Sequence, residues 1–129
     1  MTKTELETYI ESTFGILPDH PFARYPDISV FRHIGNKKWF AAQMTVAKMT
    51  LGMKEEGTID IVNVKCDPEV LQSFRCQPGI YPAYHMNRNH WLTVALDERV
   101  DDDTMAFLLG ISYDLTNAKI KIRKGDTCE

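Results

Sequence analysis

The sequence lacks the features that mark several large classes of protein. No apolar run is long enough to span a membrane, and no apolar stretch follows Met1–Glu5, so neither a membrane span nor a signal peptide is predicted. A Gly-rich phosphate loop, an H-E-x-x-H motif and a G-x-S-x-G elbow are all missing. We therefore predict no catalytic residue, no cofactor and no metal site, and we expect a binding protein rather than an enzyme.

Cysteine is also scarce. The chain has three, Cys66, Cys76 and Cys128, and no two of them follow C-x-x-C spacing. An odd number without that spacing argues against a disulfide framework and against a zinc site. Cys66 and Cys76 flank one predicted helix, which separates them too far for pairing. Reduced thiols of this kind predict a cytoplasmic protein.

An excess of positive charge is missing too. The formal net charge is −3, whereas domains that bind nucleic acid mainly through their overall charge are usually basic. Any contact with nucleic acid must therefore come from local basic patches. The composition, 43% hydrophobic and 26% charged over 129 residues, is typical of one globular domain.

The residue patterns predict a single α+β domain over residues 1–118, with a basic, flexible tail over 119–129. The predicted order is α-β-β-β-α-β-β-α, with an antiparallel sheet and the helices on one face. The helices are expected over 5–14, 68–76 and 101–115, and the strands over 29–34, 39–49, 58–65, 80–86 and 91–96.

The sequence also predicts where the helices begin and end and which residues of the second strand face the core. Thr4 is the expected N-cap of the first helix and Gly15 its end, and Asp67 followed by Pro68 starts the second helix. Asp101 begins the last one. On the second strand, alternation predicts one core-facing set of residues. These are Phe40, Ala42, Met44 and Val46.

Three motifs carry a resemblance to a known family. Residues 65–69 read Lys-Cys-Asp-Pro-Glu, residues 82–91 read Pro-Ala-Tyr-His-Met-Asn-Arg-Asn-His-Trp, and residues 112–115 read Ser-Tyr-Asp-Leu. Over residues 5–116 the chain resembles the MmcQ/YjbR family. That resemblance implies a CyaY-like "double wing" fold and a DNA-binding function. A frataxin-like iron role fits poorly, because the first helix offers only Glu5, Glu7 and Glu11 among apolar residues.

Both predicted hairpins have basic tips, with Lys37 and Lys38 on the first and Arg88 on the second. A double-wing protein that binds DNA would need two such basic projections, because their cations would contact the phosphates. Asn87 and Asn89 beside Arg88 are candidates for contacts with base edges. Asparagine is equally expected there as a turn residue, and basic tips are common simply because turns are solvated.

The second hairpin also carries imidazole and aromatic groups. His85 and His90 lie on opposite arms, where they can bind phosphate, move a proton, or hold the hairpin through hydrogen bonds; a metal would need a third ligand, and none is near in sequence. Tyr81, Tyr84 and Trp91 can stack on bases or pack in the core. Strand alternation predicts that Tyr81 and Tyr84 lie on opposite faces of the sheet.

Two functions remain open at this point. The first is DNA binding through Lys37, Lys38 and Arg88. The second is binding of a small anionic molecule or a protein partner in a cleft beside the second hairpin. Its residues would be Tyr81, Tyr84, His85, His90 and Trp91. Lys65, which precedes the second helix, is expected to pair with a carboxylate or to reach a ligand, mainly because of the resemblance.

Overall fold

Five strands form one open antiparallel sheet, in the order β1-β2-β3-β5-β4, in the computed structural model, which describes residues 1–117. The α+β fold and the predicted order of helices and strands are confirmed. The strands are β1 (Ser29–Arg32), β2 (Trp39–Ala47), β3 (Thr58–Lys65), β4 (Ile80–Pro82) and β5 (Trp91–Ala95). The expectation for residues 119–129 lies outside the described residues.

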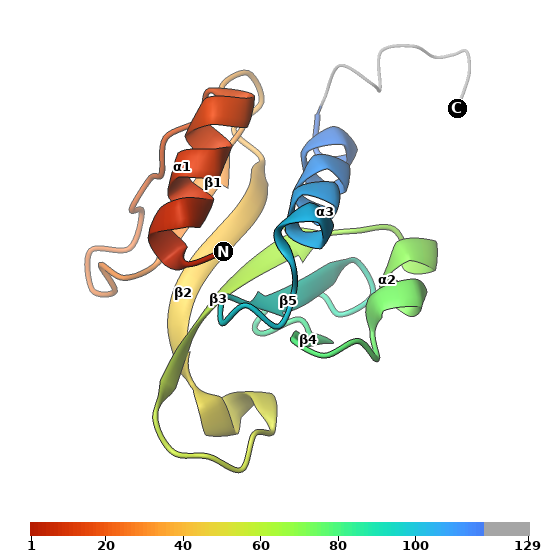
Figure 1. Ribbon diagram of the computed structural model, residues 1–129. Helices are drawn as coiled ribbons and strands as arrows, with labels where there is room; N and C mark the ends of the chain where they lie inside the picture. Colours follow the sequence, from red (N-terminus) through yellow and green to blue (C-terminus); the bar gives the residue numbers. More distant parts are fainter. Residues whose placement is uncertain (118–129) are drawn as a thin grey trace.

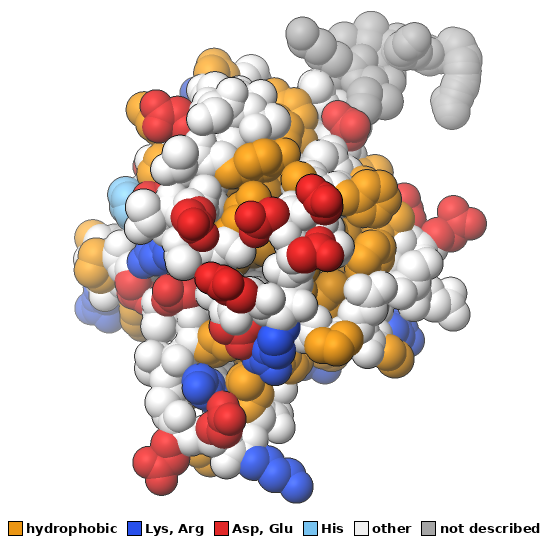
Figure 2. Space-filling view, in the orientation of Figure 1, with side chains coloured by type: hydrophobic (Ala, Val, Ile, Leu, Met, Phe, Trp, Pro, Cys, Tyr) orange, Lys and Arg blue, Asp and Glu red, His pale blue; other side chains and the backbone are white. Residues whose placement is uncertain are grey.

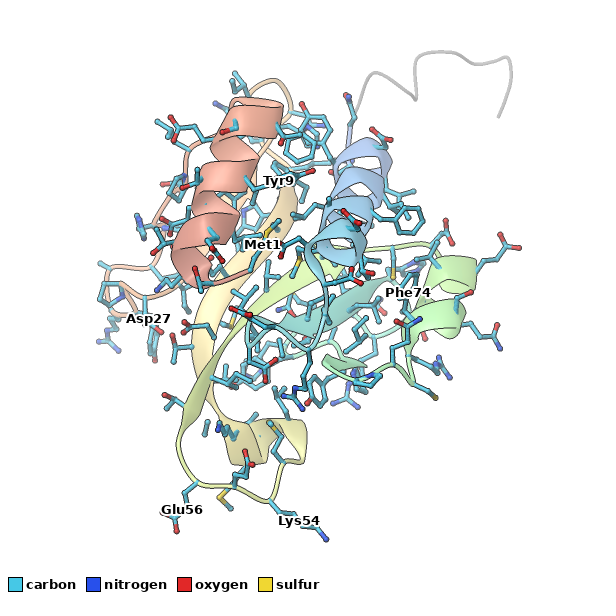
Figure 3. All side chains as sticks on the ribbon, in the orientation of Figure 1. Met1, Tyr9, Asp27, Lys54, Glu56 and Phe74 are labelled. Atoms are coloured by element: carbon cyan, nitrogen blue, oxygen red, sulfur yellow. The ribbon has the colours of Figure 1, made fainter. Side chains whose placement is uncertain are left out.

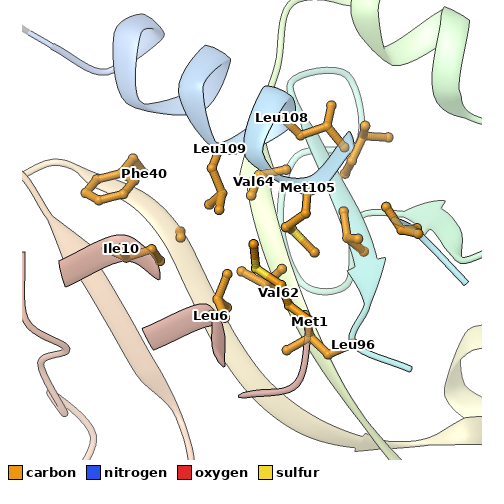
Figure 4. Close-up of a cluster of buried hydrophobic side chains, with 14 of the residues drawn as sticks. Met1, Leu6, Ile10, Phe40, Val62, Val64, Leu96, Met105, Leu108 and Leu109 are labelled. Carbon is orange, nitrogen blue, oxygen red and sulfur yellow. The ribbon is translucent and has the colours of Figure 1, made fainter. Parts of the chain in front are cut away.

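The helices cover one face of this sheet, as predicted. Figure 1 shows α1 (Lys3–Phe14) and α3 (Asp102–Leu115) in front of the sheet and α2 (Pro68–Phe74) beyond the end of β3. The main core lies between them, with Leu6 and Ile10 of α1 facing Leu108 and Leu109 of α3 across Val62 of β3 (Figure 4). Among residues 1–117, no helix has the length and apolar character needed to cross a membrane.

Local hydrogen bonds set the helix ends. The N-cap of α1 is Thr2 rather than the predicted Thr4: its hydroxyl accepts from the Glu5 N–H while the Glu5 carboxylate accepts from the Thr2 N–H. Gly15 ends α1 with φ 72°, in the left-handed conformation that glycine tolerates best. Asp67 caps α2 and Asp101 caps α3, as the sequence predicts.

A β-bulge changes the faces of β2. The register of β1 against β2 shifts between Phe31 and Arg32, so β2 carries one extra residue there. Phe40 and Ala41 consequently both join the core under the helices, whereas Met44 packs on the opposite face. The prediction of one continuous core face on β2 is therefore wrong. It had grouped Phe40, Ala42, Met44 and Val46.

The sheet face that points away from α1, α2 and α3 is called the open face. It has a small apolar cluster of its own. Val46, Ile59, Ile61 and Ala95 are buried there. The chain covers them with residues that follow β2, including a short 3-10 helix, η1 (Lys48–Leu51), which the sequence did not predict. It also covers them with residues of β4 and of the segment that follows it.

The second hairpin is less regular than predicted. β4 ends at Pro82 instead of continuing to Met86, and residues 83–90 leave the sheet before β5 begins at Trp91. Proline has no N–H to continue the ladder of hydrogen bonds, which explains the early end of the strand. Cys66 is a buried free thiol and Cys76 an exposed one.

Candidate functional site

Residues 83–90 fold back over the open face and are held there by two buried side chains. Asn63 of β3 and Thr93 of β5 are cross-strand partners, and both are fully buried. The Tyr84 N–H donates to Thr93 Oγ1 at 2.8 Å, and the Tyr84 carbonyl accepts from Asn63 Nδ2 at 3.0 Å. Thr93 Oγ1 donates in turn to Asn63 Oδ1 at 2.5 Å. This Asn63–Thr93 clamp fixes the backbone of the segment at Tyr84.

The turn after the clamp is shaped by backbone strain and by an asparagine. His85 has φ 58°, an uncommon value for a residue with a side chain, and its ring lies against the Tyr84 ring at a centroid distance of 4.1 Å. The Asn87 side-chain oxygen accepts from the Asn89 N–H at 2.8 Å. Two roles were expected for Asn87, one as a turn residue and one as a contact to a base edge. This hydrogen bond shows the turn role, and the amide NH₂ of Asn87 can still donate.

The end of the segment 83–90 lies close to the other two motifs, residues 65–69 and 112–115. The His90 carbonyl accepts from the Cys66 N–H at 2.8 Å, next to the cross-strand pair of Lys65 and Trp91. The Ser112 hydroxyl of α3 accepts from the Lys65 N–H at 2.8 Å and donates to the Phe40 carbonyl at 2.5 Å. Segments far apart in sequence therefore meet around the end of β3.

Burial makes Cys66 an unsuitable nucleophile. Burial, together with the neighbouring Asp67 carboxylate, raises the pKa of the thiol to about 11. Within residues 1–117, no three His, Cys, Asp or Glu side chains are grouped so that they could hold a metal ion. The region offers hydrogen-bonding groups, positive charge and aromatic surface.

The segments with the two predicted basic tips lead into strands that begin at the same end of the sheet. β2 begins where β3 ends, and Lys65 at the end of β3 pairs with Trp91 at the start of β5. The turn with Lys37 and Lys38 leads into β2 at this end of the sheet, and the segment with Arg88 leads into β5 there. The Arg88 side chain itself lies near η1, which follows the other end of β2. Lys37, Lys38 and Arg88 are all exposed, and Lys37 adopts φ 65°.

Acidic residues are unevenly distributed along the chain. Residues 28–54 and 80–96 contain no Asp or Glu, and within the five described strands Asp60 is the only acidic residue. The helices that cover the sheet are acidic instead, and Figure 2 shows their carboxylates gathered on that face. These residues are Glu5, Glu7, Glu11, Asp102, Asp103 and Asp114.

A pocket of about 150 Å³ lies between η1 and the clamped segment. Thr50 and Leu51 line it from η1, and Tyr81, Tyr84 and Arg88 line it from the other side. The prediction that Tyr81 and Tyr84 lie on opposite faces is wrong, since both pack against the cluster on the open face. Alternation ends with β4, and the clamp turns Tyr84 back over the sheet.

The structure does not bring all the predicted site residues together. Tyr81, Tyr84 and Arg88 meet at the pocket, whereas Lys37 and Lys38 lie in the turn before β2, at the end of that strand opposite to η1. Of the remaining predicted residues, four lie within the segment 83–90: His85, Asn87, Asn89 and His90. The other two, Lys65 and Trp91, form the cross-strand pair next to the end of this segment.

Sequence reasoning missed the residues that organise the pocket. Asn63 and Thr93 were counted only as strand residues, and Thr50 was assigned to no element. One signal was present: Asn63 interrupts the apolar run Ile61–Val64, and a buried amide in such a position needs hydrogen-bond partners.

A second buried polar group lies beneath the turn that carries Lys37. The His33 Nε2 is 2.7 Å from the Thr116 hydroxyl, and its ring lies against Tyr113 at the end of α3. Burial lowers the pKa of His33, and the nearby Lys38 ammonium lowers it further. The Tyr113 backbone acts in the opposite direction. This histidine anchors the turn to α3.

Fold and site together define a small α+β domain whose open sheet face is covered by the clamped aromatic segment and by the short η1 region. A family model described as YjbR matches residues 12–115. The chain is 34% identical to YyaQ of Bacillus subtilis (strain 168) over 116 residues, which cover 90% of this chain and 98% of that protein. The chain belongs to the YjbR family.

Other relatives agree with this placement. YjbR of Escherichia coli (strain K12) is 34% identical over 77 residues, covering 58% of this chain and 65% of that protein. A crystal structure of a Pseudomonas syringae protein matches with a TM-score of 0.88 and 37% identity, over 91% of this chain and all of that one. A Deinococcus radiodurans protein with a DUF419 domain shares the fold, with a TM-score of 0.67, 24% identity and coverage of 99% of this chain and 83% of that one. These names state no ligand, so the ligand must be inferred from the residues of this chain.

Proposed function

We propose that this protein binds DNA, with Lys37, Lys38 and Arg88 contacting phosphates. The observation that carries the proposal is the absence of carboxylates from the two segments that hold these cations. Although the net charge is −3, residues 28–54 and 80–96 contain no Asp or Glu, and within residues 1–117 the only acidic residue of the strands is Asp60. A phosphate group that approaches either tip therefore meets a cation with no like charge in the same segment.

Two of these cations are available for phosphate. Among residues 1–117, the side chains of Lys37 and Arg88 take part in no ion pair or hydrogen bond, and both are exposed. Arginine is well suited to bidentate contact with phosphate oxygens. Asn89, beside Arg88, supplies an exposed amide for a base edge, and the free NH₂ of Asn87 can assist it.

The affinity is expected to be modest and strongly dependent on salt. Each phosphate contact adds about 0.9 to the slope of log K against log salt concentration, so three contacts give a slope of about −2.7. Fluorescence anisotropy with a labelled duplex, repeated between about 50 and 200 mM salt, measures this slope.

Charge-removal variants test the residues. Arg88→Ala and Lys37→Ala should each weaken binding and reduce the slope by about 0.9. Lys3→Ala is the matched control, because Lys3 lies on α1, on the helix-covered face of the sheet. In Figure 3, Lys54 lies at the tip between η1 and β3, close to the pocket residues of η1, and is therefore unsuitable as a control. No binding at about 50 mM salt, or an equal loss with Lys3→Ala, would refute the proposal.

A further inference from the structure

We propose that the pocket between η1 and the clamped segment holds one unpaired nucleobase, so that the protein prefers single-stranded to duplex nucleic acid. This inference rests on the proposed function, and it names the form of nucleic acid and the part of the site that selects it. Tyr81 and Tyr84 supply the aromatic surface, and Arg88 contacts a phosphate next to the bound base.

The two tyrosine side chains are held in place by their neighbours. Both are half-buried, pack against the cluster of the open face and line the pocket. The Arg99 guanidinium carbon lies 6.0 Å from the centroid of the Tyr81 ring, and the His85 ring centroid lies 4.1 Å from that of Tyr84, so a base would add to these contacts at the pocket side of the rings. Side chains already held by packing lose little conformational freedom when a base binds. Because every base has an aromatic face, such a surface accepts bases without strong sequence preference.

The size and composition of the pocket favour one flat group. Its volume of about 150 Å³ is well below the 300–1,000 Å³ that is usual for pockets that hold drug-sized ligands. Thr50 and Leu51 close the side opposite the tyrosines, so the lining offers a hydroxyl and an apolar surface. A base held in a duplex cannot enter without unpairing, which costs a few kcal/mol.

Arg88 joins this pocket to the phosphate contacts. It lines the pocket, it is exposed, and the segment 80–96 that contains it has no Asp or Glu. Its guanidinium can therefore bind a phosphate flanking the captured base. The Asn63–Thr93 clamp holds the backbone at Tyr84, so the tyrosine and the arginine a few residues later keep their relation to the sheet.

Three labelled probes of equal length test the inference with the full chain: a single strand of thymidines, the same strand with abasic residues, and a hairpin duplex. The abasic strand keeps the phosphates and removes the bases. Stacking of one base predicts that the thymidine strand binds roughly 5- to 150-fold more tightly than the abasic strand. It should also bind more tightly than the duplex.

Variants connect that difference to the pocket. Tyr84→Leu should abolish the preference for bases over abasic residues, and so should Thr50→Met, a change at an exposed position that narrows the pocket without altering the core. Tyr9→Leu is the matched control, because Tyr9 is a half-buried tyrosine of α1 on the helix-covered side (Figure 3). Thermal unfolding of each variant identifies any that fail to fold.

The outcomes separate the two proposals. Equal binding of thymidine and abasic strands overturns the nucleobase pocket, yet it leaves DNA binding intact if Lys37→Ala still reduces the salt slope. A base preference that survives both Tyr84→Leu and Thr50→Met also overturns the pocket. Inorganic phosphate that displaces thymidine and abasic strands equally would assign the pocket to a small anion instead. Absence of binding for all three probes overturns both proposals.

Discussion

Replacing Thr93 by valine is expected to release residues 83–90 from the open face. Valine keeps the shape of threonine but removes a hydroxyl that makes two hydrogen bonds, one to Asn63 Oδ1 and one from the Tyr84 N–H. The side chain is fully buried, so water cannot replace these bonds while the segment stays in place. The change therefore isolates the clamp from the packing of β5.

The size of the effect follows from the groups left without partners. A buried polar group that loses its hydrogen bond costs about 1–3 kcal/mol, which gives about 2–6 kcal/mol for two groups. The lower half of that range, about 2–4 kcal/mol, is expected for the free energy of unfolding. The reason is that Tyr84 is half-buried, and a local opening of the segment lets water reach its amide.

Two measurements check this expectation. Urea unfolding should give a lower midpoint with an unchanged m-value, and hydrogen exchange should show that the Tyr84 amide loses protection. Thr58→Val, at the exposed start of β3, is the matched control and should change stability by no more than about 0.5 kcal/mol. If Thr93→Val costs no more than this control and the Tyr84 amide stays protected, the clamp does not hold the segment.

The remaining predictions concern a pair of glycines and a histidine. Gly79→Ala should destabilise the protein by more than about 1 kcal/mol, because Gly79 has φ +85° and an added Cβ would lie 2.9 Å from Val100 Cγ2. Gly110→Ala, where an added Cβ meets nothing within 4 Å inside α3, should instead stabilise it by about 0.5–1 kcal/mol; thermal unfolding of the pair tests the order. Because burial lowers the pKa of His33, the unfolded chain takes up a proton first as the pH falls below 6.5, and stability should decline there. His33→Gln should remove that part of the pH dependence in urea unfolding, and an unchanged dependence would contradict it.

Elements set by local hydrogen bonds and turns were predictable, but the start of α1 was not. Thr2 with Glu5 and Thr4 with Glu7 both fit the capping-box pattern, so local sequence cannot choose between them. Tertiary contacts favour the earlier start: it brings the Met1 side chain into the core and the Met1 ammonium within 3.1 Å of an Asp102 carboxylate oxygen. Such contacts between residues far apart in sequence have no signature in the residues around Thr2.

The site was predictable in its residue types and unpredictable in its geometry. The cluster of aromatic, imidazole and basic residues indicated the right segment. Alternation then failed for Tyr81 and Tyr84, because it holds only while a strand continues and β4 stops at Pro82. The direction of the chain beyond Pro82 depends on Asn63 and Thr93, which lie on strands distant in sequence. A bulge in β2 altered the core face for a similar reason, since it arises from pairing with β1.

Some residues of the motifs stabilise the structure, and others have side chains that are available for a ligand. The side-chain oxygens of Ser112 and Asn87 accept hydrogen bonds from backbone N–H groups. Tyr84 and His90 form backbone hydrogen bonds that hold residues 83–90 against β3 and the residue after it. Arg88 has no such structural task within residues 1–117. Substitutions in the first group should therefore lower stability and binding together, whereas Arg88→Ala should change binding alone. A fall in stability with Arg88→Ala would mean that the arginine supports the segment, and its availability for phosphate would then be in question.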